Sequence, residues 1–171
     1  MSFSIDGRPI GPGQPTFVIA EIGVNHDGSL QKALELVRVA ANCGASAVKL
    51  QIFRATTLLH SSASLAAYQR EHTRETTPLD MLRKYELPTE DLRKIVKAIR
   101  DLKLVPLASV FSPPDVETAE ALRLPAIKIA SPDIVNRVLL NRAAQSGKTL
   151  LLSTGAAEMN EIETTVQWLT D

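Results

Sequence analysis

The stretch that most constrains the fold is AVKLQIF at residues 47–53. Side chains alternate between the two faces of a strand, so the aliphatic residues at even positions share one face, while Lys49 and Gln51 share the other. An apolar face toward covering helices and a polar face toward the interior are typical of a barrel mouth. A lysine enclosed in such a strand destabilises the fold unless partners or a ligand compensate its charge. We therefore expect Lys49 to be retained for chemistry.

Two further apolar runs enclose a charge in the same way. They are FVIAEIG at residues 17–23, which contains Glu21, and AIKIAS at residues 126–131, which contains Lys128. By their shared parity and their late position in each strand, five polar side chains are expected to converge at the C-terminal ends of adjacent parallel strands. They are Glu21, Lys49, Gln51, Ser109 and Lys128. Phe111 shares the strand face of Ser109.

Apolar runs alternate with helical patterns along the chain. The expected strands cover residues 16–22, 47–53, 104–111, 126–131 and 149–154, and the expected helices cover 29–43, 89–102, 115–123, 135–146 and 159–169. Residues 3–10 predict a small hairpin that turns at Asp6-Gly7. Ser29 and Thr89 are the expected N-caps of the first two helices, and Gly44 ends the first. Strand, helix and strand in succession predict an α/β fold with a parallel sheet.

Length separates the two α/β architectures that fit this order. A complete (β/α)₈ barrel takes roughly 250 residues, so a chain of this length should hold about five of its eight units. An open doubly wound sheet of five strands would have a similar length. The first strand, however, leads into EIGVNHDGS and not into a G-x-G-x-x-G turn, so dinucleotide binding has no support. We predict a TIM-barrel type of fold.

Charge and composition exclude several classes of protein. The chain has 19 basic and 19 acidic residues, so it has no general electrostatic reason to bind nucleic acid or an anionic membrane. Its first residues, MSFSIDGRPIG, contain no apolar signal region, and no run approaches the ~18 apolar residues of a membrane span. These features predict a cytoplasmic protein.

The cysteine and the histidines have mainly structural interpretations. The single cysteine, Cys43, lies before Gly44 at a helix end and is expected to be a small buried side chain. His26 lies between typical turn-forming residues and is expected to make a structural hydrogen bond. His60 and His72 lie in a polar insertion and are expected to be solvated. No metal motif is recognisable among them.

Residues 54–88 form the longest connection between expected strands and helices. A connection of this length in a compact domain is usually functional or mobile. One interpretation is a lid over the barrel mouth, with Tyr68 and Gln69 reaching the substrate. The other is a solvated surface excursion. A short helix within residues 77–87 would anchor its far end.

Taken together, these motifs resemble the N-acetylneuraminate (sialic acid) synthases and their pseudaminate, legionaminate and spore-coat polysaccharide relatives. The matching stretches occur in family order: AEIGVNHDGSL at 20–30, AVKLQIF at 47–53, AAYQ at 66–69, VFS at 110–112, PAIKIAS at 125–131 and LLSTG at 151–155. The resemblance implies a TIM barrel that condenses phosphoenolpyruvate with an N-acetylated aldose such as N-acetylmannosamine. The products would be a 2-keto acid and phosphate.

The resemblance also implies roles for individual residues. Lys49 and Ser109 would hold the carboxylate of phosphoenolpyruvate, and Lys128 and Ser131 would hold its phosphate, with Phe111 in the same substrate-binding set. Glu21 and Gln51 would face the sugar aldehyde, and Asp133 would help to position the attacking water or sugar. In the family a divalent metal, Mn²⁺ or Mg²⁺, polarises the aldehyde.

Some positions depart from the family pattern. Residues 108–111 read ASVF where family members typically have STPF, and residues 131–133 read SPD in place of SGE. Asp133 has a carboxylate arm one methylene shorter than glutamate, and Pro132 removes a backbone N–H. These changes bear on which sugar is accepted.

The family metal ligands and a small antifreeze-like domain would follow Asp171. We therefore interpret residues 1–171 as the N-terminal part of a synthase, which would form a homo-oligomer or pair with the remaining half of the barrel. Two alternatives stay open: another phosphoenolpyruvate or sugar-phosphate TIM-barrel enzyme, and an inactive partial barrel that acts as an anion-binding or assembly module.

Overall fold

The structure is a computed structural model that describes residues 3–58 and 77–170. Its centre is a five-stranded parallel sheet with the strand order β3-β4-β5-β6-β7, so neighbours in the sheet are also neighbours in the chain. The strands are β3 (Ile19–Gly23), β4 (Ala47–Ile52), β5 (Val105–Val110), β6 (Ala126–Ile129) and β7 (Thr149–Leu152). Sequential order with a helical connection between neighbours is the arrangement of a TIM-type barrel, here with five of about eight units.

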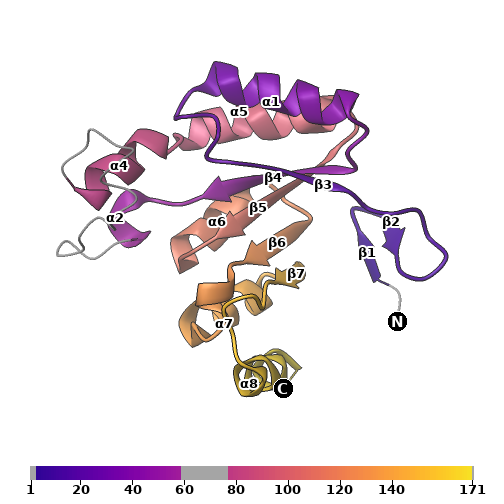
Figure 1. Ribbon diagram of the computed structural model, residues 1–171, viewed down its shortest axis with the longest axis vertical. Coiled ribbons are helices and arrows are strands. Elements are labelled where there is room, and N and C mark those ends of the chain that lie inside the picture. Colours follow the sequence, from indigo (N-terminus) through magenta and orange to yellow (C-terminus); the bar gives the residue numbers. More distant parts are fainter. Residues whose placement is uncertain (1–2, 59–76, 171) are drawn as a thin grey trace.

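Seven α-helices and one short 3₁₀ turn connect or follow these strands within the described residues. They are α1 (Leu30–Asn42), α2 (Ala55–Leu58), α4 (Pro78–Tyr85), α5 (Thr89–Asp101), α6 (Pro113–Ala121), the 3₁₀ turn η1 (Ser131–Asp133), α7 (Arg137–Gln145) and α8 (Met159–Thr170). A separate hairpin of β1 (Phe3–Ile5) and β2 (Arg8–Ile10) precedes the sheet. Figure 1 places this hairpin at the opposite end of β4 from α2 and α4.

The two faces of the sheet differ as the alternation in residues 47–53 predicts. On one face, apolar side chains from β4, β5 and β6 pack against α1, α5, α6 and α7 in the larger core cluster. On the other face, Leu107 and its neighbours at the N-terminal ends of the strands form a second cluster with Ile5 of the hairpin. Arg8 links this hairpin to the sheet, because its guanidinium donates to the carbonyl oxygens of Ser46 (3.3 Å) and Lys103 (2.6 Å). The hairpin therefore covers the N-terminal end of the interior.

Two local expectations are wrong. Thr89 is the first residue of α5 and not its cap, because the carbonyl of Pro88 already accepts the N–H groups of Asp91 and Leu92. Cys43 is exposed and not buried, since it is the C-cap residue of α1 and lies beyond the helix face that packs on the sheet. The Ser29 cap is confirmed by a hydrogen bond from Lys32 N to Ser29 Oγ of 3.3 Å.

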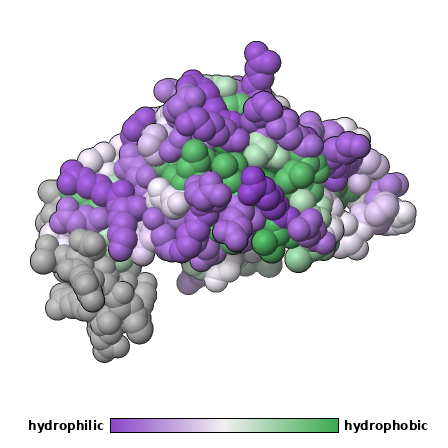
Figure 2. All heavy atoms as spheres, turned by 90° about the horizontal axis from the view of Figure 1, so that it is seen from above, coloured by the Kyte–Doolittle hydropathy of each residue, from purple (hydrophilic) through white to green (hydrophobic). Residues whose placement is uncertain are grey.

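Figure 2 looks onto the outer face that α1 and α5 form in Figure 1. Charged and polar side chains surround a strip of apolar ones on this face. Val39 of α1 is 52% exposed, and Leu102 at the end of α5 is 42% exposed. Partly exposed apolar side chains of this kind are common on protein surfaces.

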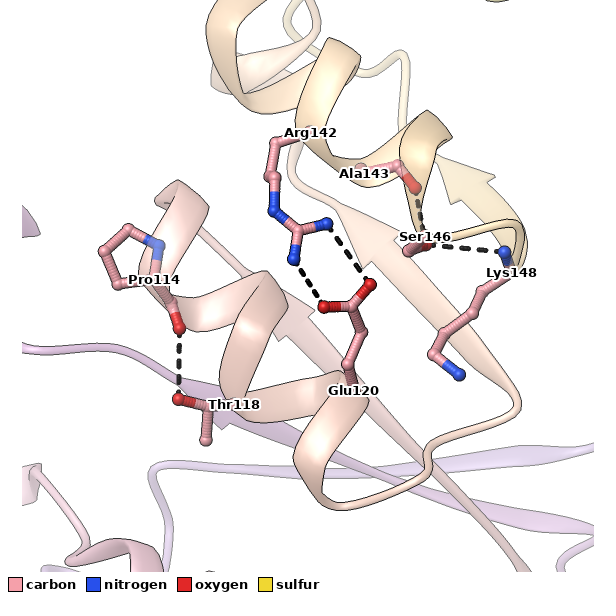
Figure 3. A network of polar contacts seen from close by, with 7 residues as sticks. All are labelled: Pro114, Thr118, Glu120, Arg142, Ala143, Ser146 and Lys148. Atoms are coloured by element: carbon pink, nitrogen blue, oxygen red, sulfur yellow. Dashed lines mark hydrogen bonds and ion pairs between the residues drawn. The ribbon is translucent and has the colours of Figure 1, made fainter.

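An ion pair joins the consecutive helices α6 and α7 on the outer side of the sheet (Figure 3). The guanidinium of Arg142 donates to both carboxylate oxygens of Glu120 through two nitrogens, and the distance to Oε1 is 3.2 Å. Each partner favours the charged form of the other, so the pKa of Glu120 is lowered and the pKa of Arg142 is raised. The two-pronged geometry sets the orientation of the two helices more than a single contact would.

The sheet has two edges within the described residues. There, β3 pairs with β4 alone and β7 pairs with β6 alone, so one side of each edge strand keeps its backbone groups free of a sheet partner. Exposed edges of this kind pair readily with other chains. We therefore expect the isolated 171-residue chain to self-associate in sedimentation velocity experiments.

A charge on the edge tests this prediction of self-association. Leu151 belongs to edge strand β7, and Leu151→Lys should reduce association because a charge there disfavours further strand pairing. Val166→Lys places the same charge on α8 at a side chain that is 50% exposed, and it should leave association unchanged. A strictly monomeric unchanged chain at micromolar concentration would contradict the prediction.

Candidate functional site

A cluster of polar side chains lies on the interior face of the sheet, next to the apolar cluster that contains Leu107. Its centre is Lys49 on β4, whose Nζ donates to Ser109 Oγ on β5 at 3.1 Å and also contacts the carboxylate of Glu21 on β3. The strand register explains the meeting, because Glu21 is opposite Lys49 and Ser109 is opposite Lys128. Four neighbouring strands therefore each contribute one polar group, with Ser109 and Lys128 two residues further along their strands than Glu21 and Lys49 in the register.

Gln51 joins this cluster one step further along β4, opposite Ser109. Its amide Nε2 and the Oε1 of Glu21 both lie close to Gly23, where a Cβ would be 3.3 Å and 3.1 Å from them. Gly23 has φ of +49°, and the β3–β4 register shifts between Glu21 and Gly23. Sequence reasoning missed Gly23. A glycine two residues after Glu21 was a usable signal, because glycine occurs where other groups approach the backbone closely.

Burial and charge lower the pKa of Lys49 to about 8. Desolvation is the larger cause, and the like charge of Lys128 adds to it. The contact with Glu21 acts in the opposite direction, since a carboxylate stabilises the ammonium form. Two ammonium groups that raise each other's energy make a site that favours an anion.

Lys128 and Asp133 form the second part of the cluster. Burial lowers the pKa of Lys128, and the charge of Asp133 opposes that shift. Burial also raises the pKa of Asp133, against a hydrogen bond with Asn136 and the charge of Lys128. Asp133 lies in η1, directly after β6, and Ser131 begins the same turn. Ser131 therefore belongs to the turn and not to the strand, as the alternation in β6 requires.

One part of the sequence argument needs correction. Glu21 was expected to be an enclosed charge, but its side chain is 42% exposed, compared with 15% for Lys49. The reason is topological, because Glu21 lies on β3, an edge strand of the described sheet. Lys49 lies on the second strand and is shielded from both sides.

Phe111 follows β5 immediately and meets Phe53, which follows β4. Their rings are 6.4 Å apart between centroids and make an edge-to-face contact at 86°. This aromatic pair lies just beyond Gln51 and Ser109 at the C-terminal ends of the two strands. Tyr68 and Gln69, the expected lid residues, lie outside the described residues.

His26 is buried in the turn after β3, where its Nδ1 accepts a hydrogen bond from Gly28 N at 3.0 Å. Burial lowers the pKa of His26, which favours the neutral imidazole that such an acceptor requires. The structural interpretation is confirmed. His60 and His72 lie outside the described residues.

The described residues contain no group of side chains that could form a metal centre. Within residues 3–58 and 77–170, no group of three or more His, Cys, Asp and Glu side chains could hold a metal ion. The donors present therefore do not fit the divalent metal that the resemblance implies, and we derive no step through it. In the same residues, no helix is long and apolar enough to cross a membrane.

The fold and the cluster define the class of protein: a barrel-type α/β protein with two lysines on the interior face of its parallel sheet. The model of the NeuB family matches residues 36–171. The chain belongs to the NeuB family.

Two individual proteins illustrate this relationship. The chain is 34% identical over 160 residues to the N,N'-diacetyllegionaminic acid synthase of Legionella pneumophila, a match that covers 93% of this chain and 45% of the relative. The structure is similar to the N-acetylneuraminic acid (sialic acid) synthetase of Leptospira borgpetersenii in complex with citrate, with a TM-score of 0.87 and 28% identity. That likeness covers 99% of this chain and 55% of the other.

A more distant likeness concerns the fold alone. The DAHP synthase of Thermotoga maritima superposes with a TM-score of 0.70 at 15% identity. The chain spans about half the length of the curated relatives that it matches, 45% in the case of the Legionella protein. Activity, substrates and partners of the whole protein are therefore matters of proposal.

Proposed function

We propose that this protein is a nonulosonic acid synthase, which condenses phosphoenolpyruvate with an N-acetylated aldose such as N-acetylmannosamine. The observation that carries the proposal is the placement of Lys49 and Lys128 on one interior face, with Ser109 opposite Lys128 and bonded to Lys49. Phosphoenolpyruvate carries a carboxylate and a phosphate, and two fixed cations with a hydroxyl between them suit a ligand with two anionic groups.

The proposed roles follow the positions of the residues. Lys49 and Ser109 bind the carboxylate, while Lys128 and Ser131 bind the phosphate. Glu21 and Gln51 face the aldehyde. Asp133, whose pKa is raised by burial, positions the attacking water and accepts its proton. In the reaction, the enol carbon bonds to the aldehyde carbon, whose oxygen takes up a proton; water adds to the resulting cation and loses a proton, and phosphate leaves as the keto group forms.

Assembly belongs to the same proposal. The interior face and the two sheet edges need covering, so we propose that the active form is a homo-oligomer or pairs these five units with the remaining half of the barrel. The ligands of the metal, Mn²⁺ or Mg²⁺, would come from that remaining half of the barrel. The segment at 54–88 is proposed as the lid, with its root held by Glu86, which accepts from Ala55 N at 2.9 Å.

The direct test is phosphate release from phosphoenolpyruvate in the presence of N-acetylmannosamine and Mn²⁺. Release that depends on the amino sugar supports the proposal. Release with a different aldose identifies another phosphoenolpyruvate enzyme of this fold. Binding of phosphoenolpyruvate without any turnover, even after the remaining barrel half is supplied, identifies an anion-binding module.

Binding of phosphoenolpyruvate is expected to weaken as the pH rises through about 8. The pKa of Lys49 is lowered to about 8, so its ammonium group is present below this pH and lost above it. The phosphate keeps its charge in this range, because its second pKa is about 6. Affinity measured by calorimetry should fall up to about tenfold per pH unit above the transition.

A variant with a permanent charge separates this titration from other effects. Lys49→Arg carries a guanidinium that stays charged, so the loss of affinity should move to higher pH. Equal affinity of the unchanged protein at about pH 7 and about pH 9.5 would show that the charge of Lys49 does not hold the ligand.

A further inference from the structure

A buried carboxylate lies outside the polar cluster, at the third residue of α6. Asp115 is only 2% exposed. Its Oδ2 accepts two hydrogen bonds, one from Ser112 Oγ at 2.7 Å and one from Phe111 N at 3.2 Å. Its own N–H donates to Ser112 O at 3.0 Å. The side chain of Asp115 therefore fixes Phe111 and Ser112, the first two residues after β5.

At the start of α6 the N-cap serine acts as a hydrogen-bond donor. Ser112 is the N-cap of α6, yet its side chain makes no hydrogen bond to the helix backbone. Its hydroxyl donates to Asp115 in place of accepting from an N–H of the first turn. A serine N-cap ordinarily stabilises the helix through that acceptance. The Asp115 side chain therefore stabilises the turn that contains Phe111, in addition to the start of α6.

Asp115 also faces the turn after β4. Burial raises the pKa of Asp115, while its bonds to Ser112 and Phe111, and the charge of Arg54, lower it. Arg54 lies 3.7 Å from Glu86 in an ion pair. Asp115, Arg54 and Glu86 border a cavity of about 10 Å³, together with Phe53. A volume of this size holds about one water at most, so the packing around the carboxylate is nearly complete.

We propose that Asp115 is a positioning residue for the anion site, and that it acts through Phe111 and the end of β5. The chain of contacts is short. Asp115 holds the Phe111 amide, Phe111 packs edge-to-face on Phe53, and Ser109, two residues before Phe111, accepts from Lys49. By fixing the turn, Asp115 keeps the Phe53–Phe111 contact and the Ser109 hydroxyl in the positions that the anion site requires. The effect on ligand affinity rests on the proposed function.

Two readouts test the proposal separately. The first is independent of any ligand: amide hydrogen exchange at Phe111 and the aromatic NMR signals of Phe53 and Phe111. In Asp115→Ala the Phe111 amide should exchange at least about tenfold faster, without global unfolding, because its acceptor is gone. Asp115→Asn keeps a carbonyl acceptor and should restore most of the protection.

The second readout is the affinity for phosphoenolpyruvate. Asp115→Ala should weaken binding about tenfold, and Asp115→Asn should rescue it in part. If Asp115 acts through Phe111, the double variant Asp115→Ala/Phe111→Ala should lose no more affinity than Phe111→Ala alone. Should Asp115→Ala fail to fold, Ser112→Ala removes one of the two donors and should produce a smaller loss in the same direction.

Asp91 supplies the matched control. It is the third residue of α5, the same helix position that Asp115 occupies in α6, but it pairs with Lys94 at 3.0 Å on the surface. Asp91→Ala should lower stability slightly and leave affinity and Phe111 exchange unchanged. An equal loss of affinity in Asp91→Ala, or additive losses in the double variant, would overturn the proposal.

The two failures can be told apart. If the unchanged protein binds no phosphoenolpyruvate, the proposed function fails, and the role of Asp115 is then decided by the Phe111 amide and the two ring signals. If the unchanged protein binds it but Asp115→Ala leaves both readouts as they were, the positioning role fails and the proposed function stands.

Discussion

Replacing Lys49 by Met is expected to reduce the affinity for phosphoenolpyruvate at least about 100-fold and to abolish phosphate release. Lys49 donates to Ser109 and contacts Glu21, so it is the ammonium group that ties the cluster together. Met keeps most of the apolar bulk of the side chain, although it is one atom shorter, and removes the charge together with the hydrogen bond to Ser109. Calorimetry with phosphoenolpyruvate measures the first effect, and the phosphate-release assay measures the second.

The fold should survive this change. Lys49→Met leaves Glu21 without its ion-pair partner, but the Glu21 side chain is 42% exposed and can be hydrated, so the loss of stability should be small. Lys97→Met, at a lysine that is 75% exposed on α5, is the control and should alter neither binding nor stability. If Lys49→Met collapsed the melting temperature while binding per folded molecule stayed the same, Lys49 would have a structural role instead.

Gly28→Ala is expected to cost roughly 2–4 kcal/mol of unfolding free energy. Gly28 has φ of +73°, and a Cβ at this position would lie 2.1 Å from the backbone oxygen of Lys84. That oxygen belongs to α4, so the clash can be relieved only if α4 moves away from the turn after β3. Urea unfolding, followed by circular dichroism, measures the loss.

Gly147→Ala separates the clash from the backbone strain. Gly147 has φ of +64° and nothing within 4 Å of its virtual Cβ, so only the left-handed conformation is penalised, at about 1 kcal/mol. Equal losses in the two variants would show that α4 yields freely. A larger loss in Gly28→Ala supports a fixed contact between α4 and the turn that contains His26.

The strands and their two faces could be predicted from the sequence because they depend on local order. The period of two in residues 47–53 separates Lys49 from its aliphatic neighbours, whatever else the chain does. The same alternation places Ser109 and Lys128 on the interior face, where the register brings them opposite each other. The His26 turn follows from Asp27 and Gly28, both of which adopt positive φ.

Other features could not be predicted, because they depend on neighbours that are distant in the sequence. The exposure of Glu21 depends on β3 being an edge strand, and the crowding at Gly23 depends on Gln51 arriving from β4. The clash behind Gly28 requires α4 to lie against the turn. Asp115 was overlooked because an acidic residue in the first turn of a helix is common, and only its burial beneath Phe111 distinguishes it.

The sequence by itself thus determined the order of the units, the parity of each strand and the family to which the motifs point, since all three are written in local pattern. Only the tertiary structure decided which polar groups touch, how far each is buried and which backbone positions have no room for a side chain. The reason is physical: solvent exposure, pKa and steric contact are properties of what surrounds a residue, and parallel strands are brought together by connections tens of residues long.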